Sequence, residues 1–257
     1  MNWDKNIYIE RFTQNNICPN VKIYYFEAGN NNPVYPIENI KKPNILMIAA
    51  THGDEPSGYH ALNNIKNAII NGDIQLSKGS LTLIPALNEY GLNNNKRETD
   101  NFGLDDGGGG DINRSYPTQK NSKPKSYHAK IVQEYMKYCD LILDFHEGYH
   151  FYKMDQSSIG STLHATNFNN EKTHAFNAIN AINNSITDPD KKWTLLDEKA
   201  DIPTSCRYYA KIVKKPHILI ETTGKLNAQP LQIRVNQATT VAESILNDMG
   251  MLKKFEI

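Results

Sequence analysis

The sequence has few cysteines, no long apolar run and no apolar N-terminal segment. Its three cysteines, Cys18, Cys139 and Cys206, are widely spaced and form no CxxC pair. This pattern argues against a disulfide framework or a thiolate-bound zinc and is typical of a reducing compartment. No apolar stretch approaches the roughly 18 residues of a membrane span, and the first residues, MNWDKNIYIERF, lack the core of a signal peptide. We therefore expect a cytoplasmic protein that does not enter a membrane.

The sequence also lacks an excess of charge of either sign. Lys and Arg together number 28, as do Asp and Glu, so the formal net charge is zero. A nucleic-acid-binding protein usually has a basic excess, so nucleic acid is not an expected partner. The 257 residues, of which 39% are hydrophobic, are enough to bury a sizeable core. The oligomeric state stays open.

Short apolar runs alternate with helical patterns along the chain. Five runs are predicted to be strands, at residues 21–26, 44–50, 80–85, 140–145 and 217–222. Three segments have the apolar spacing of helices, at residues 57–71, 126–139 and 230–251. This alternation predicts an α/β fold, with a single domain over residues 1–257 and a mixed, mostly parallel sheet flanked by helices.

Polar side chains stand at the ends of three predicted strands, where open α/β sheets bind ligands. His52 and Glu55 follow the first strand with the spacing H-x-x-E, His146 follows the second, and Glu221 lies near the end of the third. Two imidazoles and one carboxylate form the ligand set of a catalytic zinc and leave a position for water. The spacing alone leaves an alternative open, in which Glu55 only favours a helix dipole and His52 is a loop residue.

A second signal favours the metal site. Asp144 lies two residues before His146, so on a strand both side chains point to the same face. A carboxylate beside a ligating imidazole is the arrangement that orients such ligands. The alternative for Asp144 is a capping or turn residue.

Four segments, taken together and in order, resemble the zinc carboxypeptidase superfamily. They are residues 50–58 (ATHGDEPSG), 111–117 (DINRSYP), 144–147 (DFHE) and 218–221 (ILIE). The sequence is most similar to the branch of succinylglutamate desuccinylase and aspartoacylase, and it also resembles the murein-peptide amidases. The resemblance implies the zinc carboxypeptidase-like fold and one Zn²⁺ per chain, with His52, Glu55 and His146 as its ligands.

The same resemblance implies roles for further residues. Glu221 matches the general base, which takes a proton from water and passes it to the leaving amine. Asn113 and Arg114 match the pair that grips a substrate carboxylate, and Arg97 stands where the family places an arginine that stabilises the oxyanion. Arg207 lies in the segment that builds the specificity pocket and could face an acidic group of the substrate. The alternative for Arg207 is a surface arginine.

Two features depart from the family pattern. Residues 193–207 contain no tyrosine, whereas some carboxypeptidases carry one upstream of the general base. The desuccinylase and aspartoacylase enzymes carry an extra C-terminal β domain, and residues 222–257 are too few to build one. This shortage favours a compact peptidase or amidase.

We therefore predict a zinc-dependent hydrolase that cleaves an amide bond next to a free carboxylate, in a small molecule or short peptide. The substrate is a peptide C-terminus or, nearly as well supported, an N-acyl amino acid. A protein of another class, which binds a carboxylate ligand without catalysis, is the alternative, and Glu221 argues against it because binding needs no general base. Two imidazoles and one carboxylate suit zinc, but manganese and cobalt remain open.

Two other reactive side chains have no predicted role. His217 has no companion at ligand spacing and is expected to be a surface or structural histidine. Cys206 has no base nearby in the sequence, so a nucleophilic cysteine is not expected.

Overall fold

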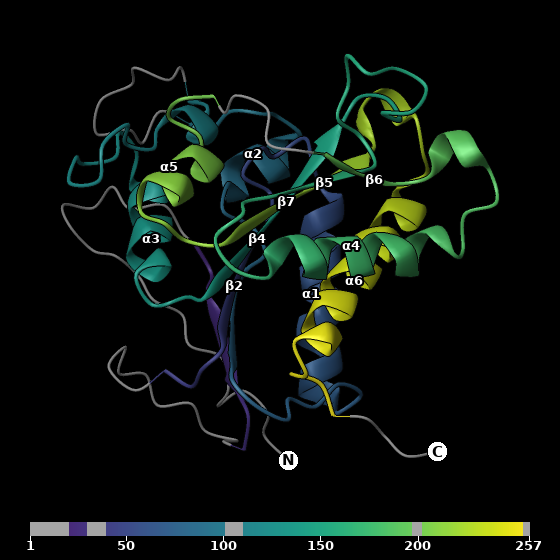
Figure 1. Ribbon diagram of the computed structural model, residues 1–257. Coiled ribbons are helices and arrows are strands. Elements are labelled where there is room, and N and C mark those ends of the chain that lie inside the picture. The colour runs from purple at the N-terminus through teal and green to yellow at the C-terminus, as the bar shows by residue number, and fades with distance from the viewer. Residues whose placement is uncertain (1–20, 30–39, 101–109, 197–201, 254–257) are drawn as a thin grey trace.

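Seven strands of the described chain form one sheet in the computed structural model, which describes residues 21–29, 40–100, 110–196 and 202–253. Their order is β1 (Tyr24–Glu27), β3 (Ser80–Ile84), β2 (Asn44–Ile48), β4 (Leu141–Gly148), β7 (His217–Thr223), β5 (Thr162–Ala165) and β6 (Thr194–Leu196). The central strands β3, β2, β4 and β7 are parallel, while β1 and β5 run antiparallel to their neighbours β3 and β7 (Figure 1). The predicted mixed, mostly parallel sheet is confirmed.

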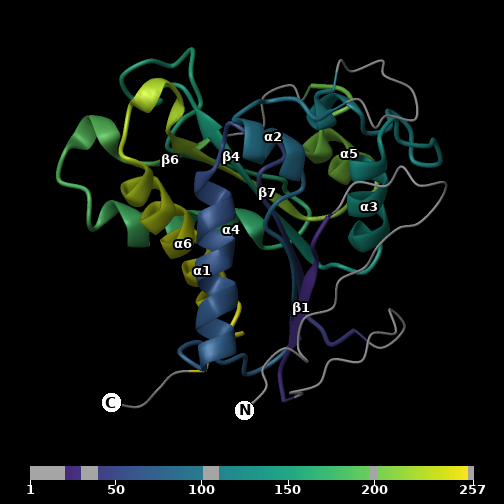
Figure 2. The same ribbon diagram turned by 180° about the vertical axis from the view of Figure 1, so that it is seen from behind.

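Helices cover both faces of this sheet. One face packs against α1 (Ser57–Asn71), α4 (Glu171–Asn183) and α6 (Leu231–Asp248), and the other against α3 (Tyr127–Met136) and α5 (Cys206–Ile212). The short helix α2 (Glu89–Asn94) follows β3. The two groups of helices lie on opposite sides of the sheet in Figures 1 and 2. This arrangement produces two hydrophobic cores, one on each side of the sheet.

The alternation of side chains along β4 decides where its polar residues lie. Leu143 and Phe145 belong to the core beneath α1 and α6, whereas Ile142 belongs to the core beneath α3 and α5. Successive strand residues point to opposite faces, so Asp144 and His146 share the face of Ile142. This places the polar side chains of β4 at the carboxyl end of the sheet, on the α3–α5 side.

The structure extends β4 beyond its predicted end. The apolar pattern predicts a strand over 140–145 with His146 after it, but β4 runs from Leu141 to Gly148 and includes His146. The carboxyl end of the strand is polar because it lines a pocket, so hydrophobicity underestimates its length. The elements β5, β6, α2, α4 and α5 have no counterpart in the sequence-based prediction.

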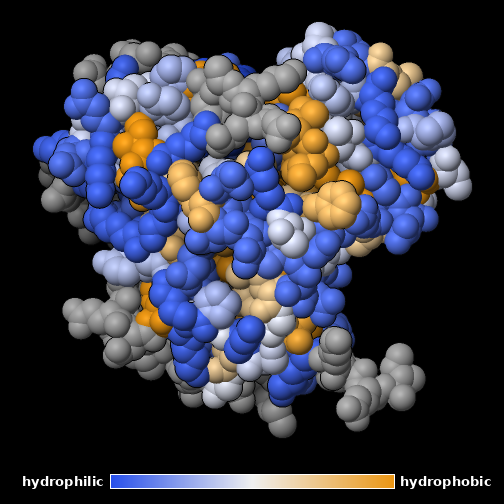
Figure 3. Space-filling model, viewed as in Figure 1, coloured by the Kyte–Doolittle hydropathy of each residue, from blue (hydrophilic) through white to orange (hydrophobic). Residues whose placement is uncertain are grey.

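No helix in the described ranges combines the length and apolar character needed to cross a membrane. The face shown in Figure 3 is mostly hydrophilic, with small separate groups of hydrophobic residues. Residues 1–20 lie outside the described residues. They include Cys18 and the segment in which we expect no signal peptide.

Candidate metal centre and its pocket

A strained turn between β2 and α1 positions His52 and Glu55. Ala50 has a left-handed backbone conformation with φ of 48°, which costs energy for a residue with a side chain and recurs at functional sites. Gly53 packs so closely on α2 that a Cβ atom would lie 1.9 Å from the carbonyl carbon of Gly91. Packing therefore fixes the turn, and the His52 and Glu55 side chains are both buried.

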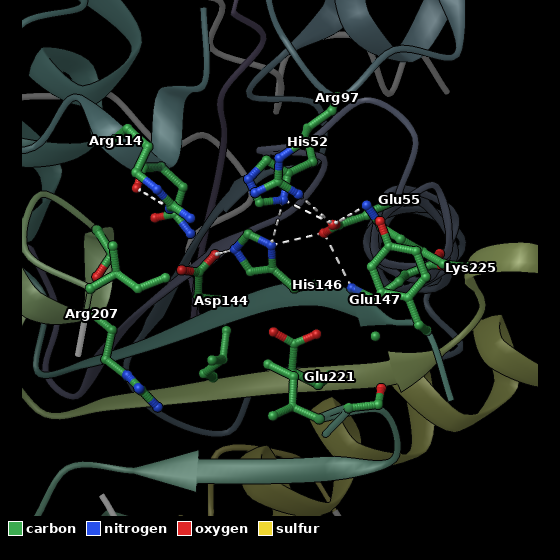
Figure 4. Close-up of a pocket in the computed structure, with 18 of the residues that line it drawn as sticks. His52, Glu55, Arg97, Arg114, Asp144, His146, Glu147, Arg207, Glu221 and Lys225 are labelled. Atoms are coloured by element: carbon green, nitrogen blue, oxygen red, sulfur yellow. Dashed lines mark hydrogen bonds and ion pairs between the residues drawn. The ribbon is translucent and has the colours of Figure 1, made fainter. Parts of the chain in front are cut away.

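His52, Glu55 and His146 converge on one point (Figure 4). The Nδ1 atoms of the two imidazoles are 3.1 Å apart. The Glu55 Oε1 atom lies 2.9 Å from Nδ1 of His52, and Oε2 lies 2.8 Å from Nδ1 of His146. These separations are close to the edge of a ligand tetrahedron around zinc, about 3.3 Å for bonds of about 2.0 Å. The three side chains therefore fit a divalent metal ion.

Each imidazole contacts a carboxylate through its other ring nitrogen. The Nε2 atom of His52 lies 3.2 Å from Asp111 Oδ1, and Nε2 of His146 lies 3.3 Å from Asp144 Oδ1. A carboxylate at the far nitrogen fixes the orientation of the ring and leaves Nδ1 for the metal. The expected placement of Asp144 beside His146 is confirmed, and Asp111 does the same for His52.

The charges around the three side chains favour a cation. Burial raises the pKa of Glu55, but His52 and His146 lower that pKa well below its ordinary value. Burial lowers the pKa of His146, but Asp144 and Glu55 raise that pKa well above its ordinary value. The same anionic surroundings that attract a proton to the imidazole attract a divalent metal ion.

Asp111 also holds Arg97 beside the metal centre. Its Oδ2 atom accepts hydrogen bonds from Arg97 Nε at 3.1 Å and from Nη2 at 3.0 Å. The remaining nitrogen, Nη1, lies 3.5 Å from Glu55 Oε1. One carboxylate thus orients both a candidate metal ligand and the arginine predicted to stabilise the oxyanion.

Replacing Asp111 with asparagine is expected to weaken metal binding by about 10- to 100-fold, because the partner that orients His52 is altered. The amide oxygen can still accept the hydrogen bond from the Asn113 N–H that caps the short helix at Ile112–Arg114. A titration against a competing chelator measures the affinity. Asp188→Asn is the control, because Asp188 also caps a short helix, but its side chain is 43% exposed and does not line this pocket. An unchanged affinity in Asp111→Asn would contradict the orienting role.

Glu221 faces the metal centre from the neighbouring strand. It pairs with His146 in the register of β4 and β7, and its carboxylate points toward the His52, Glu55 and His146 side chains in Figure 4. Burial raises the pKa of Glu221 to about 8, although His146 lowers it. A carboxyl group with such a pKa can take up a proton near neutral pH and release it again, as a general base requires.

The raised pKa has a consequence for the stability of the metal-free protein. Between pH 4.5 and about 8 the folded state keeps a proton on Glu221 that the unfolded state releases. The contribution of Glu221 to the free energy of unfolding therefore falls as pH rises through this range. Glu221→Gln mimics the protonated form. Its stability relative to the original protein is expected to increase across this window, by up to about 1.4 kcal/mol per pH unit. Urea unfolding at a series of pH values measures the difference, and a pH-independent difference would contradict it.

A pocket of about 270 Å³ opens in front of the metal centre. All the side chains predicted from the sequence for the site line it, namely His52, Glu55, Arg97, Asn113, Arg114, His146, Arg207 and Glu221. Arg114 and Arg207 lie on one side of the centre in Figure 4, and Lys225 lies on the other. The fold thus gathers residues from widely separated segments around one cavity.

Asn113 and Arg114 are held differently. The Asn113 Oδ1 atom accepts a hydrogen bond from the Cys206 N–H at 2.9 Å, which ties the amide to the start of α5. Arg114 Nη1 donates to the Asn113 main-chain oxygen at 2.8 Å, and no carboxylate of the described residues lies within ion-pair distance of its guanidinium. A guanidinium without a carboxylate partner is suited to bind one from a substrate.

Lys225 and Tyr149 also line the pocket and were not predicted. The Lys225 Nζ atom lies 3.0 Å from Glu55 Oε1 and 2.9 Å from Asp54 Oδ2, and it stands 5.5 Å from the centre of the Tyr149 ring. These contacts join loops far apart in the chain, so no local pattern indicates them. Asp111, in contrast, begins the motif DINR and could have been recognised.

Comparisons with known proteins agree with this arrangement. A family model described as the succinylglutamate desuccinylase/aspartoacylase catalytic domain matches residues 41–246. No curated protein matches the chain. The apo crystal structure of the cell shape determinant Csd4 from Helicobacter pylori is similar with a TM-score of 0.70 and 21% identity, over 92% of this chain and 56% of that chain.

Two further structures are similar. The ectoine utilization protein EutE (DoeB) from Ruegeria pomeroyi has a TM-score of 0.62 and 19% identity, over 93% of this chain and 64% of that one. A succinylglutamate desuccinylase/aspartoacylase from Rhodobacter sphaeroides has a TM-score of 0.60 and 14% identity, over 99% of this chain and 69% of that one.

These likenesses confirm the zinc carboxypeptidase-like fold. The chain spans only a little more than half the length of the Csd4 structure. The family and its neighbours, among them Csd4, which is described as a D,L-carboxypeptidase, are hydrolases that act on amide bonds. Because the family model covers most of the sequence, the chain belongs to the succinylglutamate desuccinylase/aspartoacylase family.

Proposed function

We propose that this chain is a zinc-dependent hydrolase that cleaves an amide bond next to a free carboxylate, as a metallocarboxypeptidase or a peptide amidase. One observation carries the proposal. The pocket that contains the two imidazoles and the carboxylate of the candidate metal centre also contains a buried carboxyl group, Glu221. It also contains the guanidinium of Arg114, which has no carboxylate partner among the described residues. Together these side chains can hold a metal ion, accept a proton and bind the carboxylate of a substrate.

His52, Glu55 and His146 would hold one zinc ion. When bound, zinc lowers the pKa of water and polarises the scissile carbonyl. Glu221 accepts a proton from the attacking water on a carboxylate oxygen and then donates it to the leaving nitrogen. The burial that raises the pKa of Glu221 suits it to hold the proton between the two transfers.

The arginines and Asn113 bind and orient the substrate. Arg97 is fixed by Asp111 and presents Nη1 next to the metal centre, where it stabilises the negative charge that develops on the carbonyl oxygen. Arg114 binds the free carboxylate, helped by the amide nitrogen of Asn113. The substrate is a small molecule or a short peptide that carries such a carboxylate.

The two arginines on the same side of the pocket are expected to respond differently to substitution. Arg114→Ala should raise KM by about 10- to 100-fold for every substrate with a free carboxylate, because a charge-assisted interaction of about 1.5–3 kcal/mol is lost. Arg207→Ala should lower kcat/KM only for substrates with an acidic side chain. Kinetics on peptide pairs that differ only by Glu or Gln measure both effects. Equal loss on the two members of a pair would remove the proposed acidic contact of Arg207.

The proposed hydrolase is tested with purified protein before and after metal removal. The substrates are peptides with a free C-terminus, the same peptides with an amidated C-terminus, and N-acyl amino acids. We expect cleavage of free-carboxylate substrates only, loss of activity after complete chelation, and recovery with added zinc. Activity that survives complete metal removal would refute the proposal.

An N-acyl-amino-acid deacylase is the second candidate, favoured by the family model itself, which describes desuccinylase and aspartoacylase domains. The first candidate, a peptidase, is instead supported by the structural neighbours, which include Csd4 bound to a tripeptide or to mDAP. The same substrate panel separates the candidates, since a deacylase should prefer N-succinylglutamate or an N-acyl aspartate over any peptide. Binding of these ligands by the zinc-loaded protein without turnover would instead indicate an inactive carboxylate-binding protein.

We also infer that residues 1–257 act as one catalytic domain in the cytoplasm. The family match over residues 41–246 supports the first part, and the free thiols of Cys139 and Cys206 support a reducing compartment. Fractionation of cells that produce the protein tests the location.

A further inference from the structure

A second buried group of metal-ligating side chains lies next to the metal centre. Asp144 on β4, His217 at the start of β7 and Cys206 at the start of α5 each offer a ligand atom, and these atoms lie within 4.8 Å of one another. All three residues are at most 1% exposed. Along the sequence, His217 has no companion at ligand spacing and Cys206 has no nearby base. The pairing of β4 with β7 and the packing of α5 against β7 bring them together.

Polar atoms in this group lack the hydrogen bonds that buried groups normally have. Among the described residues, neither ring nitrogen of His217 has a hydrogen-bond partner, although the residue is 0% exposed. Its Nε2 atom lies 3.5 Å from Asp144 Oδ2, near the separation of about 3.3 Å between two ligands of one zinc ion. An ion between these side chains would satisfy them.

We propose that Asp144, Cys206 and His217 bind a second divalent metal ion with affinity for sulfur, such as Zn²⁺. The sulfur–metal bond forms as the S–H proton leaves to water, so one proton is released for each ion bound. The Asp144 carboxylate and the Cys206 thiolate then balance the two positive charges of the ion, which keeps the buried unit neutral. Three side-chain ligands leave the fourth position of a zinc tetrahedron for water or another donor.

The thiol itself does not act as a nucleophile. Burial raises the pKa of Cys206 well above its ordinary value, and the adjacent Asp144 raises it further. An unliganded Cys206 is therefore a neutral thiol, in spite of the nearby imidazole. The spacing of the cysteines along the sequence argues against a thiolate-bound zinc, but the fold brings the Cys206 thiol next to ligand atoms from two other elements.

The second ion would act on the first site through Asp144. One carboxylate oxygen of Asp144 faces His146 and the other faces His217. An ion bound to the second oxygen would fix the carboxylate and so the ring orientation of His146. Asp144 and Ser205, the residue before Cys206, line the pocket, which gives the ion a route of entry.

Cobalt-loaded protein tests this second site, because a cobalt–thiolate bond has a charge-transfer band in the near ultraviolet. We expect two equivalents of cobalt per chain and such a band in the unaltered protein. Cys206→Ser should lose the band and one equivalent. Cys139→Ser is the matched control, since Cys139 is also 1% exposed but is not part of either group of metal-ligating residues, and it should keep both.

X-ray absorption of the zinc-loaded, unaltered protein gives a second measurement that does not depend on a variant folding. The first site supplies only nitrogen and oxygen, so a sulfur neighbour at about 2.3 Å from zinc must come from another site. Sulfur that persists in Cys18→Ser and Cys139→Ser would support the second site. One metal equivalent per chain, no sulfur around zinc, or a band that survives in Cys206→Ser would overturn it. None of these results would affect the hydrolysis proposed for the first site.

Discussion

Replacing His146 with alanine is expected to remove the metal ion of the first site and to lower kcat/KM by about a thousandfold or more. The Nδ1 atom of His146 lies 3.1 Å from His52 Nδ1 and 2.8 Å from Glu55 Oε2, so its removal takes away one of three ligands. Metal catalysis contributes several kcal/mol to such hydrolyses, and each 1.4 kcal/mol is about tenfold in rate. Elemental analysis and initial rates on the same sample measure both quantities.

The control for this substitution is His128→Ala. His128 is 3% exposed, close to the 4% of His146, but it lies on α3 and does not line the pocket. Its replacement should leave the metal content of the first site unchanged. If His146→Ala retained both its metal and its rate, His146 would not be a ligand.

Glu221→Gln is expected to lower kcat by about 10²- to 10⁴-fold, the usual contribution of a general base. Glutamine has nearly the same shape as glutamate but cannot accept the proton of the attacking water. The metal content should stay the same and KM should change little, because Glu221 is not among the three converging ligand residues. Steady-state kinetics combined with metal analysis separates loss of the base from loss of the ion.

Glu243→Gln serves as the comparison for that experiment. Burial also raises the pKa of Glu243, but this residue lies on α6 and does not line the pocket. Its substitution should leave kcat unchanged. A Glu221→Gln protein with normal kcat, or one whose defect followed only from lost metal, would contradict the role of a general base.

The central part of the fold could be predicted because its elements are long and strongly patterned. The strand β2 is buried along its whole length and apolar after Asn44, and α1 spans the 57–71 range predicted from the sequence. The strands β5 and β6 have only four and three residues, too few for a clear pattern. Helix α4 buries small alanines at Ala175 and Ala178, which weakens the hydrophobic signal that would reveal it.

Some residue groups of the candidate site could also be predicted from the sequence, whereas others could not. His52 and Glu55 are close in sequence, as are Asp144 and His146, so local spacing indicates that each pair can act together. The contact of Lys225 with Glu55 and the grouping of Cys206 with His217 arise only when strands and loops meet in three dimensions. No pattern along the chain encodes those meetings.

The most direct test of the first metal site is a crystal structure of the zinc-loaded protein, with diffraction measured above and below the zinc absorption edge. We expect an anomalous peak bonded to the Nδ1 atoms of His52 and His146 at about 2.0–2.1 Å and to the carboxylate of Glu55. The Glu221 carboxylate should face the open side of that ion. A map without a peak among these three side chains, or with a peak that Glu55 does not contact, would contradict the proposed centre.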